Sequence, residues 1–402
     1  MRSIEALTPQ AGSDDPAGLR EVDADELARY AVDPGHPWWR RRSCVTALTG
    51  RVPEPYVPEL IARIQDPADT AEVRRALLDL LSDRAELLPW LRHEDRASDA
   101  SYGMAAAFFK ARGLLGDLSA ARELATLAAS PWRHTRDTGD AGLDGLVDRY
   151  GAEVVLAELG EDRPEDREFR VRTRYRAGED VTYALADPDR RVAHLAHTLA
   201  TDADRLRACL DEAPTPEAKV WAACALHRLT EDRAEARAAY ERLGRPRVEV
   251  EGLDEELRGA IVQEYGPGCE RPSDPRWRLE AVCAEPPPGP DVDDLLRRAT
   301  AALTAAGPAP KPPVSCGDDN QQGDGTYYVI EAGGDRLLLS TLGPFVTAAE
   351  PLPEAVVRQL VSAGFRWIDD ETGALRVTDL CVYYFGAREP LTVGELLFYW
   401  QD

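Results

Sequence analysis

Between residues 38 and 244, apolar side chains recur every three or four positions, which is the period of one buried helix face. In the segment 71–81, for example, Val73, Leu77, Leu80 and Leu81 fall on one side of a helix. Glycine and proline separate neighbouring segments, so the pattern predicts a succession of helical hairpins. The predicted helices cover residues 38–49, 55–65, 71–81, 102–115, 118–129, 188–200, 203–212, 216–229 and 232–243.

Two of these segments fall into register with each other. Pro188–Val192 and Pro216–Val220 both read Pro-x-x-x-Val, 28 positions apart, and each opens a helical apolar stripe. Asp187 is the expected N-cap of the first helix, with Pro188 at the first helical position. A supersecondary unit repeated at such a period indicates stacked helical hairpins, an α-solenoid. That architecture predicts a long surface for holding a partner and no particular chemistry.

The sequence LADPDRRV at Leu185–Val192 resembles the Leu-x-Asp-Pro-x-x-x-Val-Arg pattern of HEAT repeats, in particular the short bacterial kind associated with phycobilin-lyase-like proteins. Ala193 stands where that family often has arginine. Asp66-Pro67 followed by Val73-Arg74-Arg75 is a looser match, and Thr215–Val220 keeps the helix but lacks the aspartate. The resemblance covers roughly residues 35–245. It implies an α-solenoid and a binding role, and it implies no catalytic residue.

The predicted fold is mainly α, an α-solenoid of HEAT-like helical hairpins followed by a small α+β C-terminal domain. Residues 1–25 are acidic and lack a helical period, which predicts a flexible tail. The helical repeat domain is expected over residues 26–285. Residues 286–313 form a proline-rich linker with one helix, over 293–306, and residues 314–402 form the α+β domain.

The last 90 or so residues change from helical period to short β-rich runs and resemble no family. Strands are expected over 326–332 and 336–342, joined by a Gly-Gly-Asp turn, and over 365–368, 374–378 and 380–385. A helix is expected over 353–363, and Thr392 with Glu395 forms the capping box of a last helix. Because the linker implies few contacts across it, this domain is expected to fold alone.

Charge narrows the possible partners. The net charge is −24 over 402 residues, so nucleic acid is disfavoured and a partner protein with a neutral or basic surface is expected. The sequence contains no run of 18 apolar residues, so no membrane span is predicted. The seven cysteines include no Cys-x-x-Cys pair, so no disulfide framework or zinc knuckle is predicted. With no basic-then-apolar leader pattern, these features predict a reduced, cytoplasmic protein. Nearly all basic residues are arginine, as is common in proteins from GC-rich genomes.

Three sequence patterns suggest a metal site, a nucleophile or a calcium loop, but each lacks a residue that the chemistry requires. His194 and His197 have a metal-ligand spacing, but no third ligand is evident and packing beside the apolar stripe is favoured. Cys316 could act as a nucleophile only with a base, and all six histidines lie at or before His227, in the predicted solenoid. An ordinary loop or half-buried cysteine is therefore favoured. The acidic loop from Asp318 lacks the glutamate of a calcium loop, with Val329 at the twelfth position. We assign no catalytic, cofactor-binding or metal-ligating residue.

Two patterns remain as candidate partner-binding sites. Arg172 and Arg174 belong to an alternating arginine run that would form one basic face on a strand and would scatter on a helix. Exposed ion pairs are the favoured interpretation there, with a carboxylate or phosphate pocket as the alternative. Trp38 and Trp39 precede three arginines, and both residue types are favoured anchors of protein interfaces. Capping the end of the solenoid is an equally good role for the two tryptophans.

The functional hypothesis is a non-enzymatic scaffold or adaptor that binds a partner protein on the solenoid surface. One alternative is an acidic inhibitor or immunity-type protein that blocks a basic, nucleic-acid-binding partner. Another is an enzyme of unknown type in the C-terminal domain, with the solenoid as its substrate holder.

Overall fold

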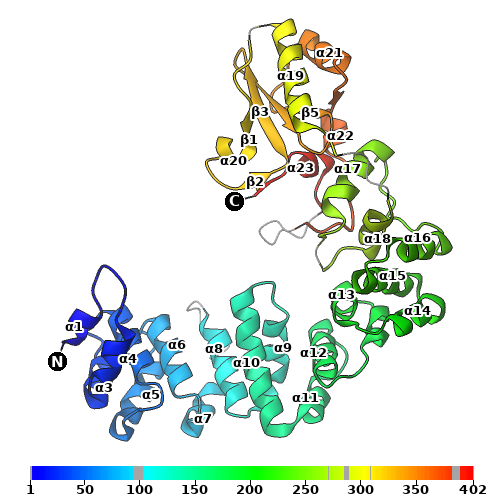
Figure 1. Ribbon diagram of the computed structural model, residues 1–402. Coiled ribbons are helices and arrows are strands. Elements are labelled where there is room, and N and C mark those ends of the chain that lie inside the picture. Colours follow the sequence, from blue (N-terminus) through cyan, green and yellow to red (C-terminus); the bar gives the residue numbers. More distant parts are fainter. Residues whose placement is uncertain are drawn as a thin grey trace. The chain divides into compact units, whose positions relative to one another are not determined.

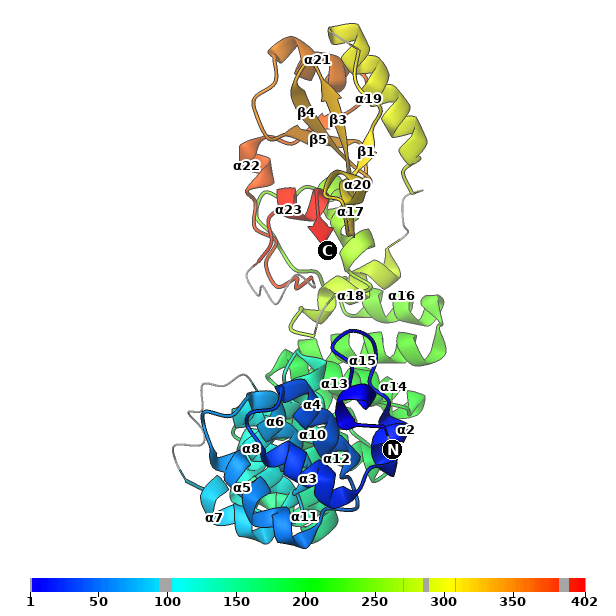
Figure 2. The ribbon, with the colours of Figure 1, turned by 90° about the vertical axis from the view of Figure 1, so that its left-hand side faces the viewer.

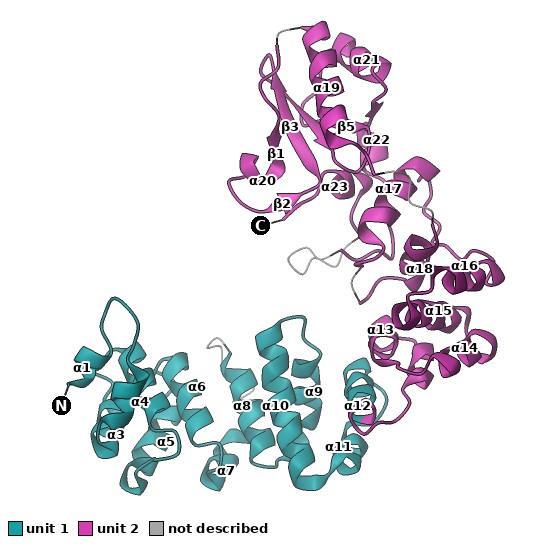
Figure 3. Ribbon diagram, viewed as in Figure 1, with its two compact units in different colours: residues 1–173 teal, residues 174–402 magenta. Residues whose placement is uncertain are grey.

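The computed structural model describes residues 2–93, 103–269, 271–284, 289–307, 309–382 and 390–401. The described chain is mainly helical, with a small sheet region near its C-terminus (Figure 1, Figure 2). It divides into two compact units, residues 1–173 and residues 174–402 (Figure 3). None of the helices within the described ranges is long and apolar enough to cross a membrane.

The first unit is built from helices alone, as far as the structure describes it, and successive helices pack on one another. Helix α4 packs on α3 and α6, α6 packs on α5 and α8, and α10 packs on both α8 and α9. The helices predicted within residues 38–129 are confirmed, with ends that differ by a few residues. All the α-helices described from the N-terminus to α12 are α1 Ile4–Leu7, α2 Pro16–Glu21, α3 Ala24–Val32, α4 Trp38–Ala47, α5 Val57–Gln65, α6 Ala71–Leu80, α7 Leu88–Leu91, α8 Met104–Leu114, α9 Ala121–Ala128, α10 Arg133–Tyr150, α11 Ala152–Leu159 and α12 Pro164–Arg176.

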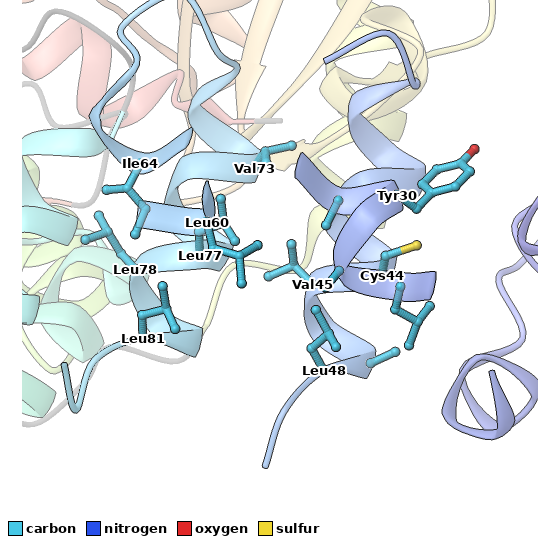
Figure 4. Packing of buried hydrophobic residues seen from close by; sticks show 14 of the residues in the cluster. Tyr30, Cys44, Val45, Leu48, Leu60, Ile64, Val73, Leu77, Leu78 and Leu81 are labelled. Carbon is cyan, nitrogen blue, oxygen red and sulfur yellow. The ribbon is translucent and has the colours of Figure 1, made fainter. Parts of the chain in front are cut away.

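One continuous apolar cluster lies between the first helices. Val45 and Leu48 of the α4 segment point toward Leu60 of α5 and Leu77 of α6, and all four are fully buried or nearly so (Figure 4). Each helix contributes one stripe to this cluster, so no single hairpin could bury its own apolar face. Burial of such side chains contributes roughly 1.5–3 kcal/mol each.

A buried arginine fastens this cluster at the end of α3. The Arg41 guanidinium donates through Nε to the carbonyl oxygen of Ala31 at 2.8 Å and to both carboxylate oxygens of Asp69 at 2.7 and 2.6 Å. Arg74 makes the same type of contact 33 positions later, from Nε to the carbonyl oxygen of Ile64 near the end of α5 at 2.9 Å. Both arginines bond a carbonyl ten residues earlier, which is a structural repeat that the sequence pattern did not reveal.

The first 25 residues differ from the expected flexible tail. Ile4, Leu7, Leu19 and Val22 are buried in the same cluster as α3 and α4. Asp15 caps α2 by accepting from the backbone N–H of Gly18 at 2.9 Å. These apolar residues belong to helices of only four and six residues, too short to produce a visible helical period.

Helix α10 was not predicted at all, because its sequence carries three glycines at positions 139, 142 and 145. Glycine is a poor helix former, but here it permits close packing. A Cβ added at Gly139 would lie 2.6 Å from the carbonyl oxygen of Leu124, and one at Gly142 would lie 2.5 Å from a methyl group of the same leucine. Gly139 and Gly142 therefore lie where α10 approaches α9 closely, and Gly145 lies beside Leu114 of α8.

The second unit begins with helices and ends with the sheet. The helices predicted over 188–200, 203–212, 216–229 and 232–243 are present, but Asp189 rather than Asp187 caps α13, accepting from the N–H of Arg191 at 2.9 Å. The helices are α13 Arg190–Leu199, α14 Ala203–Glu212, α15 Pro216–Thr230, α16 Arg233–Arg242, α17 Glu255–Tyr265, α18 Pro275–Cys283, α19 Val292–Ala306, α20 Cys316–Asp319, α21 Glu354–Ser362, α22 Asp370–Gly373 and α23 Val393–Leu397.

The sheet has five strands in the order β1-β3-β4-β5-β6, and a separate pair joins β2 to β7. The predicted hairpin is β3–β4, with Ala332 paired to Asp335 across its turn. The strands expected over 365–368 and 374–378 do not pair with each other as a hairpin: β6 pairs in parallel with β5, and residues 370–373 between them form a helix. The strands are β1 Val314–Ser315, β2 Asp324–Gly325, β3 Tyr327–Ala332, β4 Asp335–Ser340, β5 Phe345–Ala348, β6 Arg366–Trp367 and β7 Trp400–Gln401.

Two other expectations concern the end of the chain. The strand expected over residues 380–385 is absent from the described residues 380–382, and its remainder lies outside the described residues. The capping box at Thr392 and Glu395 is present and opens α23.

Both faces of the sheet are covered by helices that precede the expected domain boundary. Val346 packs with Ile330 and with Leu295 of α19, which runs beside the sheet (Figure 1, Figure 2). The adjacent Phe345 points to the opposite face and packs with Ile261 of α17 and Trp277 of α18. The α+β core therefore reaches back to residue 248, and the linker at 286–313 contributes α19 to it.

This shared core predicts that residues 314–402 do not fold alone, contrary to the expectation from the linker. Without α17, α18 and α19, the apolar side chains on both sheet faces would lose part of their cover and become more exposed to water. We expect the 314–402 fragment to show no near-ultraviolet circular dichroism, while the fragment 174–402 shows it. A cooperative thermal transition of the shorter fragment would contradict the shared core.

The α9–α10 contact predicts a large effect of one methyl group. Gly139→Ala should lower the unfolding free energy by about 1–3 kcal/mol, because the added Cβ would overlap the backbone of α9. Gly259→Ala is the matched control, since this helical glycine of α17 has open space around it and alanine should stabilise it by up to about 1 kcal/mol. Calorimetric unfolding of the full chain measures both. Equal effects would show that the α10 glycines are not packing residues.

Candidate partner-binding groove

The exposed face of α4 carries the tryptophan and arginine residues that the sequence singled out. Arg41, Cys44 and Val45 are buried in the core, whereas Trp38 and Arg42 of the same helix are exposed. Trp38 keeps 40% of its surface exposed. Its ring stands edge-on to that of Trp39, with 6.2 Å between the centroids. The two tryptophans thus divide into an exposed ring and a half-buried one.

A pocket of about 600 Å³ opens beside these rings. Its other wall is the N-terminal segment, including Pro9, Asp14 and Arg20. Arg40 holds that wall in place by donating through Nε to the carbonyl oxygen of Thr8 at 3.1 Å. The complete lining is Pro9, Gln10, Gly12, Asp14, Pro16, Leu19, Arg20, Trp38, Trp39, Arg42, Ser43, Thr46 and Ala47.

A second pocket of about 470 Å³ lies between α4 and α6. Arg42 and Thr46 line both pockets, so the two adjoin along α4. From α6 the second pocket takes Glu72, Arg75 and Asp79. We call the two pockets together the α4 groove. Pockets of 300–1,000 Å³ are large enough to enclose a small ligand or several side chains of a partner.

Two of the carboxylates in the α4 groove have partners, whereas its arginines have no ion pair among the described residues. Asp14 accepts a hydrogen bond from the Ser43 hydroxyl, and Asp79 pairs with the ammonium of Lys110 at 2.7 Å. Among the residues that the structure describes, Arg20, Arg42 and Arg75 have no ion pair. The groove therefore combines an aromatic wall with three guanidinium groups whose donors face solvent.

The other predicted binding residues do not belong to this groove. Arg172 and Arg174 lie on α12, where a helix scatters the alternating arginines that a strand would have aligned. Arg172 pairs with Asp140 at 2.8 Å, and Arg174 pairs with Glu179 at 3.0 Å. Both guanidinium groups thus serve internal ion pairs, and neither lines the two pockets.

His194 and His197 pack as aromatic side chains against Trp221, with 5.7 and 5.5 Å between the ring centroids. Burial, reinforced by the positive charge of Arg278, lowers the pKa of His194 to about 4. Burial and the neighbouring His194 lower the pKa of His197 to about 3. The described ranges hold no group of three or more His, Cys, Asp or Glu side chains placed to bind a metal ion.

The candidate residues around Cys316 are also structural. Cys316 is buried, and its carbonyl oxygen accepts from the amide of Asn320 at 2.8 Å. In the acidic loop, Asp318 accepts from the Ser315 hydroxyl, and Asp319 pairs with Arg336 at 2.6 Å. The carboxylates that a calcium loop would direct to one point are thus bound to different neighbours.

A pocket of about 320 Å³ in the C-terminal unit is lined by Tyr265, Cys269 and Thr326, among other residues. Burial raises the pKa of the Cys269 thiol, although the Arg278 charge opposes this effect. A thiol that stays protonated at neutral pH is a weak nucleophile. The described lining of this pocket contains no histidine, and its carboxylates are those of Glu264 and Asp324.

Comparison with known protein families, with curated proteins and with solved structures finds no match to this chain. The resemblance to HEAT repeats therefore stays a prediction that depends on the quoted residues. The aromatic and arginine pattern at residues 38–42 was the sequence signal that located the α4 groove. Arg20, Asp14 and Arg75 were missed, because nothing in the sequence brings the N-terminal segment or α6 beside α4.

The two buried histidines predict acid sensitivity of the second unit. Their pKa is lowered in the folded state, so their stabilising effect is complete above pH 6.5 and is lost as the pH falls toward 4. Each should contribute a slope of up to about 1.4 kcal/mol per pH unit in that range. His197→Gln should reduce the slope, measured by urea unfolding between pH 7 and pH 5. His134→Gln, which alters an exposed histidine, is the control, and an unchanged slope in His197→Gln would contradict the burial argument.

Proposed function

We propose that this protein is a non-catalytic binding protein, a HEAT-like α-solenoid that holds a partner protein at the α4 groove. The observation that carries the proposal is that one pocket combines the exposed Trp38 with Arg42, which has no ion pair to any described residue. Tryptophan and arginine contribute most often to the energetic centre of protein interfaces. Because Trp38 and Arg42 are exposed, the core does not depend on them, and a binding role accounts for their position.

The packing order of the first unit supports the solenoid part of the proposal. Helices α4, α6, α8 and α10 each pack on the next of the row. Arg41 and Arg74 repeat the same contact with a carbonyl ten residues earlier at a spacing of 33 positions. A period in this range is typical of helical repeat units, whose stacked inner helices present an extended binding surface.

The charges and thiols of the described residues favour binding over catalysis. The histidines of α13 are buried and their pKa is lowered, and burial raises the pKa of Cys269. Catalytic groups usually combine a nucleophile with a base within hydrogen-bond reach. The α4 groove offers two tryptophans and three arginines, residue types that are enriched in protein interfaces.

Trp38→Ala tests the proposal directly. We expect the immobilised full-length protein to retain a specific protein from a lysate of its source cells, and Trp38→Ala to lose it. Trp132→Ala is the matched control, since Trp132 is 51% exposed and lines neither pocket of the groove. With the purified partner, calorimetry should show binding weakened by about 30-fold for Trp38→Ala only. Equal retention by both variants, or no retained protein, would contradict the proposal.

A further inference from the structure

The α4 groove differs in charge from the rest of the chain. The protein carries a net charge of −24, yet the two pockets are lined by three arginines and three carboxylates. One of the carboxylates, Asp79, is neutralised by Lys110 from outside the lining. The lining of the groove is therefore neutral, with three charges of each sign, on a strongly acidic protein.

Its arginines also differ from arginines elsewhere in the described chain, most of which bind a carboxylate or a backbone carbonyl. Arg84, for example, pairs with Glu54 at 2.6 Å, and Arg207 pairs with Glu235 at 2.7 Å. In the groove, Arg20, Arg42 and Arg75 have no such ion pair among the described residues. Three guanidinium groups that lie along one surface, without an ion pair to any described residue, are the chemistry that recognises carboxylates.

We infer that the α4 groove recognises an acidic, extended segment of a partner protein, with an aspartate or glutamate carboxylate on Arg42 and an apolar side chain against Trp38. This inference rests on the proposed function and names the chemistry of its partner. Arg42 is the centre of the site because it lines both pockets. Arg20 in the first pocket and Arg75 in the second can receive further carboxylates of the same segment.

A peptide segment fits these observations better than a nucleic acid does. A nucleic acid gains affinity by releasing counterions from many phosphates, and a net charge of −24 opposes its approach. The exposed ring of Trp38 and the apolar Leu19 and Ala47 of the same pocket instead suit an apolar side chain next to a carboxylate. The local chemistry of the groove thus points to an acidic segment, although the charge of the whole chain predicts a neutral or basic partner surface.

A charge-reversal selection tests this inference. Phage-displayed random 12-residue peptides are selected on the full-length protein, on Arg42→Glu and on the control Arg233→Glu. Arg233 is exposed, lacks an ion pair among the described residues and lies on α16, outside the groove. The wild-type protein and the control should enrich peptides with aspartate or glutamate beside an apolar residue. Arg42→Glu should enrich lysine or arginine at that position.

The selected acidic peptides are then synthesised and titrated against each variant. Their affinity should fall by about 10–100-fold for Arg42→Glu and stay unchanged for Arg233→Glu. Circular dichroism melting of each variant verifies the fold, and Arg75→Glu provides a second variant of the same groove. A duplex oligonucleotide that binds more tightly than the acidic peptides at physiological salt would overturn the inference.

The outcomes separate this inference from the proposed function. If the selected peptides lose binding with Trp38→Ala but carry no acidic residue, the groove is a protein-binding site and the acidic-segment inference falls. If no selected peptide depends on Trp38, Arg42 or Arg75, both the inference and the proposed function fall. If the wild-type protein enriches acidic peptides and Arg42→Glu instead enriches basic ones, both the inference and the proposed function stand.

Discussion

The stacked helices of the first unit depend on buried guanidinium groups that satisfy the ends of neighbouring helices. The last carbonyl groups of a helix have no partner within it, and in a stack they are shielded from water. Arg41 solves this at α3 by donating to the carbonyl oxygen of Ala31, while Asp69 balances its charge from the loop before α6. Its positive charge also lies at the negative end of the helix dipole. One side chain thus joins α3, α4 and the start of α6.

Similar contacts recur along the chain and give a physical reason for its preference for arginine over lysine. Arg51 donates to carbonyl oxygens of Leu19 and Val22, and Arg228 donates to that of His197. A guanidinium presents five N–H groups in a planar fork, so it can donate to two carbonyl groups at once, whereas an ammonium is a single point charge. The high arginine content of the sequence is therefore used by the fold.

The sequence was sufficient to predict most helices, because their apolar stripes are long enough to be periodic. It failed where packing overrides local preference. The glycines at 139, 142 and 145 suggest a loop by propensity, yet close contact with α9 at the first two and with α8 at the third makes them suitable for helix α10. The short helices at the N-terminus and the α17–α18 contribution to the sheet core depend on contacts between distant residues. Of the candidate site, Trp38, Trp39 and the adjacent arginines could be found from sequence, whereas Arg20 and Arg75 could not.

The run from Arg40 to Arg42 shows how function can be added to this fold without weakening it. Consecutive residues of a helix point about 100° apart, so the three guanidinium groups have different surroundings. Arg40 binds the Thr8 carbonyl and fixes the wall of the first pocket, and Arg41 binds Ala31 and Asp69 within the core. Within the described part of the chain, the Arg42 guanidinium has neither an ion pair nor a hydrogen bond, and it lines both pockets of the α4 groove. Because the fold makes no use of its charge among the described residues, a partner can use it at no cost to stability.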